Sequence, residues 1–240
     1  MTAPRIGTAG WSIPGALAGA FPQGGSHLER YARIFDAVEI NSSFYRPHRV
    51  ATYRRWAASV PAGFRFAVKL PKAITHERRL AEAEAPLDRF LAEVAGLGTK
   101  LGPLLVQLPP SLAFAPGVAG PFLRALRARA AGPIACEPRH ASWFAPAVEA
   151  LLVELRIARV AADPAVVPAA ARPGGWPGLA YLRLHGSPRM YYSDYPEAVI
   201  AGALRALPDQ GAEGWCIFDN TAAFAATGNA LTARRMAGLA

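Results

Sequence analysis

Short apolar runs recur along the chain, and most are separated by segments with the spacing of an amphipathic helix. The runs have the length and composition of buried strands: Arg5–Ala9, Ala37–Asn41, Arg65–Leu70, Leu104–Leu108, Ile134–Glu137, Ile157–Ala162, Ala180–His185 and Trp215–Asp219. They recur at intervals of roughly 25–35 residues, which is the length of one βα unit. The pattern therefore predicts eight strands that alternate with helices.

Capping residues mark where several helices begin. Ser26 and Glu29 form a capping box, in which the Glu29 side chain reaches back to the Ser26 amide. Ser142 has the position of a cap for the helix that holds Val148 and Leu155. Two prolines are placed to open a first turn: Pro86 before Leu87–Ala95, and Pro121 before Phe122–Ala130.

Eight such units without a break in composition predict one domain over residues 1–240, a single (β/α)8 TIM-like barrel. The sixth unit is irregular, because Pro164–Gly178 is rich in Pro, Ala and Gly and is expected to be a loop or one helical turn. A doubly wound open sheet is the alternative, and it favours a Gly-rich phosphate loop after the first strand. Gly7–Trp11 lacks the third glycine and the helix that should follow it.

Polar residues end most of the predicted strands. Side chains alternate between the two faces of a strand, so counting back from each polar end separates a small face from a bulky one. The bulky face must meet the helices, so we expect the polar ends to point into the barrel and to meet at its C-terminal mouth. These ends are Glu39, Lys69, Gln107, Glu137, Asp163, the Arg183/His185 pair and Asp219, and their face holds Ala37, Ala67, Leu105, Ala135, Ala161 and Ile217.

A salt-bridge network that plugs the barrel would explain a pair such as Glu137 and Arg183. It explains polar ends on seven strands less well, because each buried ion costs several kcal/mol to desolvate. Barrel enzymes place their chemistry at this mouth. The pattern therefore favours a functional site.

Composition narrows the class of protein. The chain has 240 residues, of which 52% are hydrophobic, and no apolar run approaches the ~20 residues of a membrane helix. The N-terminal residues lack an apolar signal core, so we expect a cytoplasmic protein without a membrane partner. Cys136 and Cys216 lie in apolar runs and are interpreted as buried thiols. The net charge of +9 comes from scattered arginines without interleaved aromatics, so nucleic acid is not the favoured partner.

Several strings, taken together, resemble one known family. They are Glu39–Tyr45 (EINSSFY), Glu137–Trp143 (EPRHASW), Arg183–Gly186 (RLHG) and Asp219–Thr221 (DNT), and with Gly7–Ser12, Phe64–Lys69, Ile74–His76 and Gln107–Pro110 they span nearly the whole chain. The set is similar to the domain of unknown function 72 family (YecE-like proteins). The resemblance implies a TIM-like barrel with a polar cavity at the C-terminal mouth, and no settled activity. The family usually has a glycine-containing turn after the Asp-Asn-Thr string, whereas this chain reads Ala222–Ala225 (AAFA).

The residues at the mouth suggest distinct roles. Glu39 and Glu137 are acid/base candidates, since their surroundings can separate their pKa values. Lys69 is a base or Schiff-base candidate, although a charge partner for Glu39 is the favoured interpretation, and Asp163 completes the catalytic candidates. The substrate-binding candidates are Trp11, Asn41, Tyr45, His76, Gln107, Arg139, His140, Trp143, Arg183, His185, Asp219 and Asn220. The tyrosine cluster after Gly186 is interpreted as a lid over the mouth or as an interface; it consists of Tyr191, Tyr192 and Tyr195.

Two function classes stay open at this point. The first is a barrel enzyme that applies acid/base chemistry to a small anionic substrate bearing phosphate or carboxylate. The second is a metal-dependent phosphodiesterase or an endonuclease-like barrel that processes nucleic acid. No cofactor is predicted; a divalent metal is the alternative, with ligands from Glu39, Glu137, Asp163, His185 and Asp219. A non-catalytic binding protein is a third hypothesis. The sequence leaves the oligomeric state open.

Overall fold

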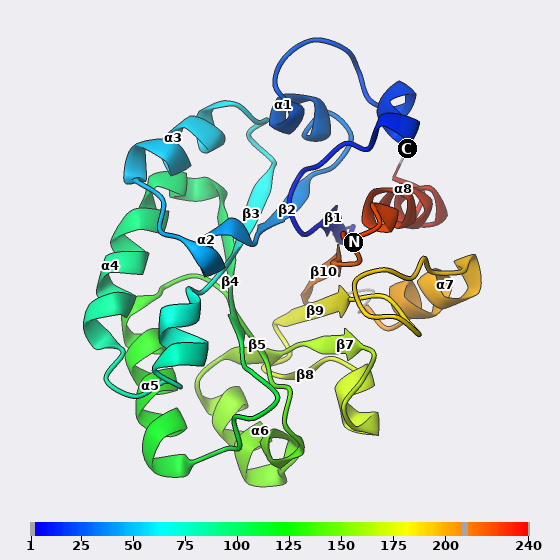
Figure 1. Ribbon diagram of the computed structural model, residues 1–240. Coiled ribbons are helices and arrows are strands. Elements are labelled where there is room, and N and C mark those ends of the chain that lie inside the picture. The colour runs from blue at the N-terminus through cyan, green and yellow to red at the C-terminus, as the bar shows by residue number, and fades with distance from the viewer. Residues whose placement is uncertain (1–2, 208–210, 240) are drawn as a thin grey trace.

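The structure is a computed structural model that describes residues 3–207 and 211–239 (Figure 1). Within these residues the strands form two sheets, ordered β1-β10-β9-β7 and β2-β3-β4-β5-β6-β8, and all neighbours are parallel except β6 and β8. The strands are β1 (Arg5–Thr8), β2 (Ala37–Ile40), β3 (Arg65–Lys69), β4 (Leu101–Gln107), β5 (Ile134–Glu137), β6 (Ile157–Arg159), β7 (Ala161–Asp163), β8 (Gly174–Gly175), β9 (Leu179–Leu184) and β10 (Glu213–Phe218). Each predicted strand is confirmed, although the sixth is divided into β6 and β7.

Helices cover the outer side of the strands (Figure 1). They are α1 (His27–Tyr31), α2 (Ser42–Tyr45), α3 (Val50–Ala58), α4 (Glu84–Val94), α5 (Pro116–Arg129), α6 (Pro146–Glu154), α7 (Glu197–Arg205) and α8 (Ala225–Met236). Shorter helical turns lie at Gly15–Ala20, Ala73–Glu77, Ala95–Lys100, Ala141–Phe144 and Pro168–Ala171. Across residues 3–207 and 211–239, no helix is both long enough and apolar enough to cross a membrane.

The helix starts show which capping predictions hold. The Ser26–Glu29 capping box is present at the start of α1. Ser142 is not the cap of α6, because its hydroxyl accepts a hydrogen bond from the Phe114 amide at 2.8 Å and α6 begins later, at Pro146. The predicted opening of a helix at Pro121 is also wrong. Pro116 opens α5 in its place, and Pro121 lies inside that helix.

The inner and outer faces of the strands bury different side chains, as predicted. One cluster contains Ala37, Ala67, Leu105, Ala135 and Ile217, and the bulky residues of the opposite face pack against the helices. Ala161 is the exception, because it packs with the outer cluster while Ala158 and Val160 pack with the inner one. The alternation along β6 and β7 is therefore one residue out of phase with the prediction.

Two seams join the sheets. β1 approaches β2 through a single parallel bridge between Ala9 and Glu39, and the Tyr31 hydroxyl accepts from the Thr8 amide at 2.9 Å while donating to the Ala37 carbonyl at 3.1 Å. At the other seam β6 runs directly into β7, and only Val160 separates them. The Val160 amide donates to the Cys136 carbonyl at 2.8 Å, so the chain passes from one sheet to the other without a loop.

Irregular segments fall where the sequence lacks periodic pattern. Residues 164–178 contain one short helical turn and the two-residue strand β8, in agreement with the prediction. In the eighth loop, Phe224 precedes α8 with a φ of 62° and is 61% exposed. A phenylalanine thus occupies the left-handed conformation that glycine adopts most readily, where the resemblance implied a glycine-containing turn. Both cysteines are buried, as expected.

A substitution at Gly102 on β4 tests the packing of the inner face. A Cβ atom at this position would lie 2.9 Å from the Trp215 ring atoms Cζ2 and Cη2 and 3.2 Å from the Phe66 carbonyl oxygen. We expect Gly102→Ala to lower the free energy of unfolding by about 1–3 kcal/mol, as overpacked cores do, measured by urea denaturation.

The matched control is Gly120→Ala in α5, where no atom beyond the two chain neighbours and the nearby helix backbone lies within 4 Å of the added Cβ. Alanine is favoured over glycine in a helix by about 0.5–1 kcal/mol, so this variant should be at least as stable as the parent protein. Equal stability of the two variants would contradict the packing of Trp215 against β4.

Candidate functional site

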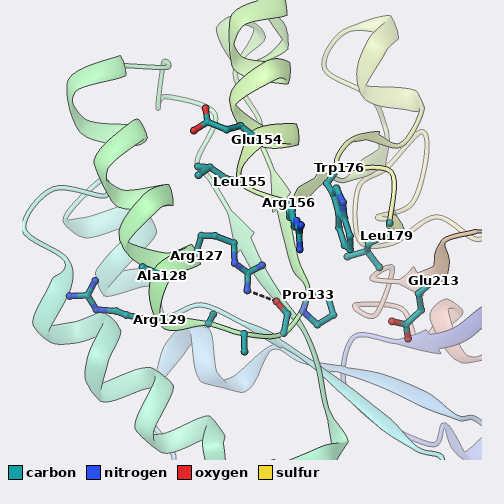
Figure 2. Close-up of a pocket in the computed structure, with 14 residues that line it drawn as sticks. Arg127, Ala128, Arg129, Pro133, Glu154, Leu155, Arg156, Trp176, Leu179 and Glu213 are labelled. Atoms are coloured by element: carbon teal, nitrogen blue, oxygen red, sulfur yellow. Dashed lines mark hydrogen bonds between the residues drawn. The ribbon is translucent and has the colours of Figure 1, made fainter.

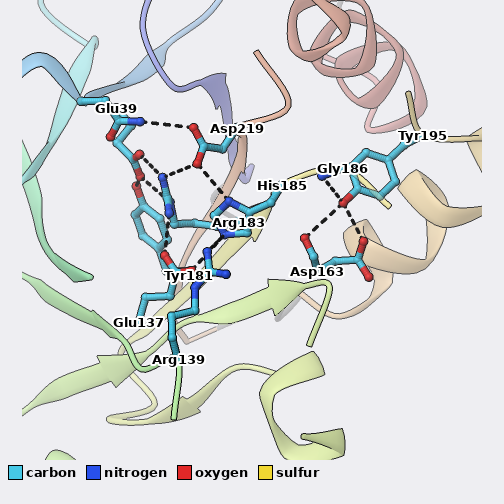
Figure 3. Close-up of polar contacts among 11 residues, drawn as sticks. Glu39, Glu137, Arg139, Asp163, Tyr181, Arg183, His185, Gly186, Tyr195 and Asp219 are labelled. Atoms are coloured by element: carbon cyan, nitrogen blue, oxygen red, sulfur yellow. Dashed lines mark hydrogen bonds and ion pairs between the residues drawn. The ribbon is translucent and has the colours of Figure 1, made fainter. Parts of the chain in front are cut away.

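Arg183 on β9 lies at the centre of a buried ionic cluster at the carboxyl ends of the strands (Figure 3). Its Nε and Nη2 donate to the two carboxylate oxygens of Glu39 at 3.0 and 2.7 Å. Its Nη1 donates to Glu137 at 2.6 Å, and Nη2 also donates to Asp219 at 2.9 Å. We call Arg183, these three carboxylates, Tyr181, His185 and Arg139 the Arg183 network. Arg183 itself has no exposed surface.

The charges of the network stabilise one another against the cost of burial. Burial acts to raise the pKa of Glu137, but Arg183, His185 and Arg139 outweigh it and hold that pKa well below its usual value. Asp219 follows the same balance: burial opposes ionisation, and Arg183 with His185 lowers its pKa. The carboxylates Glu39 and Glu137 are fully buried, so removal of the guanidinium would leave uncompensated charge in a low-dielectric interior.

His185 joins two carboxylates of the network. Its Nδ1 lies 2.9 Å from Asp219 and its Nε2 lies 2.9 Å from Glu137. Nη2 of Arg139 lies 2.7 Å from the same Nε2, and Nε of Arg139 lies 2.6 Å from Glu137 in an ion pair without a directed hydrogen bond. The imidazole is therefore held on both nitrogens.

Tyr181 belongs to the network although the sequence analysis did not select it. Its hydroxyl donates to Glu39 at 2.8 Å, and its ring stacks on Trp215 at 5.8 Å between centroids. Burial, followed by the charge of Glu39, raises the pKa of this hydroxyl well above its ordinary value. The available signal was spacing: Tyr181 and Arg183 on β9 and His185 directly after it lie two residues apart, the spacing of one strand face.

Lys69 lies beside the network without joining it. No ion pair within 4.0 Å and no hydrogen bond connects its Nζ to any described residue, so the expected pairing with Glu39 is absent. The Nζ atom lies over the Phe44 ring, 4.1 Å from its centroid. Burial and then the positive charge of Arg183 lower the pKa of Lys69 to about 8, against a partial opposing effect of the carboxylates.

A row of polar side chains forms the part of this site that reaches solvent. Lys69 ends β3 and Gln107 ends β4, while Arg139 follows β5. Since β3, β4 and β5 are neighbours, these groups lie at one edge of the strand ends. Their exposed fractions are 8% for Lys69, 9% for Gln107, 8% for Arg139 and 7% for Asp219 beside them. Asn41 donates to Asp219 at 3.2 Å and extends the row.

Asp163 is a predicted catalytic residue that the structure places elsewhere. It pairs in register with Leu184, whereas Ala162 pairs with Arg183. Its carboxylate therefore faces outward and accepts a hydrogen bond from the Tyr195 hydroxyl at 2.6 Å (Figure 3). The error came from taking the last polar residue of the strand as its inward-facing end.

Several predicted binding residues lie apart from the Arg183 network. Trp143 is buried and donates from its indole to the Leu112 carbonyl at 2.9 Å, so it packs the loops. His140 contacts Ser142, and Asn220 bonds Ser193 and Asn229. Trp11 packs edge-on against Trp56, and Tyr45 against Phe44 with most of its side chain exposed.

Two aromatic-ring groups border the site. His76 packs edge-on against Phe44, and burial followed by the charge of Lys69 lowers its pKa. Tyr191 packs edge-on against His185, with 5.9 Å between ring centroids, and its side chain is exposed. Of the three tyrosines considered as a lid, Tyr191 thus touches the network, whereas Tyr195 is buried against Asp163 and Tyr192 packs with Arg189.

The acidic and histidine side chains of the network do not form a metal site. Among residues 3–207 and 211–239, no three His, Cys, Asp or Glu side chains are arranged as a group that could hold a metal ion. The physical reason is visible in the network: Glu39, Glu137 and Asp219 all direct oxygens at Arg183.

The fold and the site define a class: mixed α/β proteins with parallel sheets and a buried ionic network at the strand ends. Within it, the chain belongs to the family described as "Protein of unknown function DUF72", which matches residues 5–240. Two crystal structures of DUF72 family proteins have the same fold. The one from Enterococcus faecalis V583 has a TM-score of 0.81 at 25% identity, covering 98% of this chain and 96% of that chain. The one from Thermotoga maritima MSB8 has a TM-score of 0.77 at 22% identity, covering 98% and 99%.

Curated relatives match over shorter stretches. The UPF0759 protein YecE of Escherichia coli K12 is 32% identical over 104 residues, which is 43% of this chain and 37% of that protein. The UPF0759 protein YunF of Bacillus subtilis 168 is 28% identical over 149 residues, or 59% and 52%. The chain thus matches between about a third and a half of the length of these relatives. Their names assign no activity.

Replacing Arg183 tests the network. We expect Arg183→Met to lower the free energy of unfolding by about 3–5 kcal/mol, because it leaves buried carboxylates unpaired. Arg124→Met is the control: Arg124 pairs with Glu154 at 2.5 Å on an exposed surface, where solvent and salt screen the pair and its loss should change stability little. Urea denaturation of both variants measures the difference, and equal losses would contradict the central role of Arg183.

The pH dependence of stability gives a second test. The folded pKa values of Glu137 and Asp219 lie below their unfolded values, so the unfolded chain binds more protons as the pH falls. Their stabilisation is complete above about pH 4.5 and is lost progressively below it. As the pH is lowered below about 4.5, we expect the urea concentration at the unfolding midpoint to decrease. The decrease should be less steep in Arg183→Met. Parallel pH profiles of the two proteins would contradict this coupling.

Proposed function

We propose that the protein is a (β/α)8-barrel enzyme that applies acid/base chemistry to a small anionic substrate at the carboxyl ends of its strands. The observation that carries the proposal is Lys69, an amine without a described partner whose pKa is lowered to about 8. General bases work best when their pKa lies near the working pH. The phosphate- or carboxylate-bearing class of substrate follows from the neighbouring Arg139.

The barrel is supported by the two seams. The Ala9–Glu39 bridge and the Tyr31 hydroxyl link β1 to β2, while β6 continues into β7. We infer that the two sheets function as one barrel with an irregular sixth unit. This arrangement gathers Lys69 and Arg183 from different sheets at one end, where barrel enzymes place their sites.

Within this proposal, Arg183 holds the network rather than the substrate. Its Nε, Nη1 and Nη2 are all engaged by carboxylates, and its side chain is fully buried. Of the two arginines predicted to bind the anion, Arg139 is therefore the one to which we assign this role. Nη1 of Arg139 has no hydrogen-bond partner among the described residues, and the side chain reaches the surface. A guanidinium offers paired donors that suit phosphate and carboxylate oxygens.

Lys69 is then the group that moves a proton. In its neutral form, Nζ accepts a proton from the bound substrate, and Arg139 together with Gln107 orients the anion in the same row. The resulting ammonium remains near Glu39, Glu137 and Asp219, whose negative charges favour the protonated amine. The carboxylates Glu39 and Glu137 thus act through the electrostatics of the network.

The metal-dependent alternative gains no support from a specific contact. Three of the four carboxylates proposed as ligands, Glu39, Glu137 and Asp219, already receive an N–H from Arg183. The fourth, Asp163, faces outward and accepts from the Tyr195 hydroxyl. A metal ion at this place would have to displace or oppose a buried guanidinium, which favours the proton-transfer proposal over the phosphodiesterase.

A ligand screen tests this function. We expect some members of a panel of phosphorylated and carboxylated metabolites to raise the Tm of the protein, with the shift reduced in Lys69→Met and lost in Arg139→Met. Loss of a charged hydrogen bond to an anion weakens affinity by about 1.5–3 kcal/mol, which is roughly tenfold to a hundredfold. Turnover of each stabilising compound is then followed by mass spectrometry.

Lys72→Met is the matched control, since Lys72 is exposed and pairs with Glu77 at 3.1 Å. It should retain every shift. The proposal fails if no compound stabilises the protein, or if stabilising compounds act equally on the parent protein and on the Lys69 and Arg139 variants.

A further inference from the structure

A pocket lies at the opposite end of the strands from Lys69 (Figure 2). Its lining includes Pro133, which precedes β5, and Leu179 and Glu213, which begin β9 and β10. The pocket has a volume of about 660 Å³, within the range of about 300–1,000 Å³ that small-molecule sites occupy. It is therefore separate from the Arg183 network.

The pocket carries uncompensated positive charge. Three of its charged residues are paired with groups on neighbouring elements: Arg129 with Asp88 at 2.7 Å, Glu154 with Arg124 at 2.5 Å, and Glu213 with Arg5 at 2.9 Å. Two more lining residues, Arg127 and Arg156, form no ion pair with any described residue. The described part of the pocket therefore presents two guanidinium groups that lack a counterion.

These two guanidinium groups act on each other. Burial, followed by repulsion from Arg156, lowers the pKa of Arg127. Arg127 is nevertheless fixed in place, because its Nη2 donates to the Gly132 carbonyl at 2.9 Å. Two cations held at one pocket without an acidic partner favour binding of an anion, and a guanidinium pair suits the several oxygens of a phosphate.

The backbone of Arg156 adds independent support. Arg156 follows the end of α6 with a φ of 52°, a left-handed conformation. Glycine adopts this conformation without a steric cost, whereas a residue with a Cβ is strained there. Backbone geometry alone therefore does not favour an arginine at this position.

Trp176 supplies a planar wall to the same pocket. In the view of Figure 2, Arg156 lies between Arg127 and Trp176. A Cβ at Gly178 would lie 2.2 Å from the indole, so the ring packs directly on this glycine. The Trp176 amide donates to the Ile157 carbonyl at 2.9 Å, which fixes the backbone. The indole is partly exposed, and an aromatic face of this kind stacks on planar rings.

We propose that this pocket binds a phosphate monoester that carries a planar ring, the chemistry of a nucleoside monophosphate. Arg127 and Arg156 hold the phosphate, and Trp176 stacks on the ring. The site is independent of the acid/base site at the other end of the strands.

Calorimetric titration of the full chain with adenosine monophosphate tests the proposal. We expect one equivalent of adenosine monophosphate to bind. Its affinity should be about tenfold or more lower in Arg127→Gln and in Arg156→Gly, because each variant loses a charged hydrogen bond to the phosphate. Trp176→Ala should also bind more weakly. Arg156→Gly should in addition raise the Tm, because it removes the left-handed strain, so weaker binding by this variant cannot come from poor folding.

Three controls complete the test. Arg89→Gln, an exposed arginine on α4 that pairs with Glu93 and does not line this pocket, and Lys69→Met, at the other site, should bind as the parent protein does. Adenosine should bind far more weakly than its monophosphate. The proposal is overturned if adenosine monophosphate does not bind, if Arg127→Gln and Arg156→Gly bind it normally, or if Lys69→Met abolishes binding.

Discussion

Three carboxylates from β2, β5 and the end of β10 meet one guanidinium from β9, and this contact constrains the whole carboxyl end of the strands. Glu39 and Arg183 belong to different sheets, so their two hydrogen bonds tie the sheets together across the interior. The geometry must be exact, because a buried ion pair repays its desolvation only when its hydrogen bonds are satisfied. Small residues beneath it, such as Ala67 and Ala135, leave the room that the network occupies.

The network also sets the electrostatics of the groups around it. Arg183 keeps its carboxylates ionised, while burial and then the same positive charge disfavour the ammonium form of Lys69. Burial, and after it the charge of Arg183, thus lowers the pKa of a neighbouring amine that forms no ion pair or hydrogen bond with a described residue. This separates two roles that the residue types alone do not distinguish: a structural guanidinium at the centre and a reactive amine at the edge.

Much of this fold was predictable from the sequence because period and burial are local properties. The strands and their inner and outer faces follow from runs such as Arg65–Lys69, and the capping box at Ser26 follows from spacing. The helix starts that were wrong depend on distant contacts: Ser142 is engaged by the Phe114 amide, and no local pattern indicates that. The prediction for Asp163 was wrong because a polar residue at the end of a strand does not show which face of the sheet it lies on. The pairing of Ala162 with Arg183 decides this, and it places Asp163 on the opposite face.

The place where the site residues converge was predictable from the sequence, but the role of each residue was less so. Glu39, Glu137, His185 and Asp219 converge as expected, whereas the enclosure of Arg183 depends on distances that only the three-dimensional structure provides. Tyr181 was missed because a tyrosine in an apolar run is indistinguishable from core until its hydroxyl is seen on Glu39.

The most direct test of the account is the pKa of Lys69, measured by competitive acylation and mass spectrometry across a pH series. The chain has three lysines, Lys69, Lys72 and Lys100, so each can be followed separately in one protein. The account predicts that Lys69 reaches half of its maximal reactivity near pH 8, and that this midpoint rises in Arg183→Met. A midpoint for Lys69 at the ordinary value of 10.5 would contradict it.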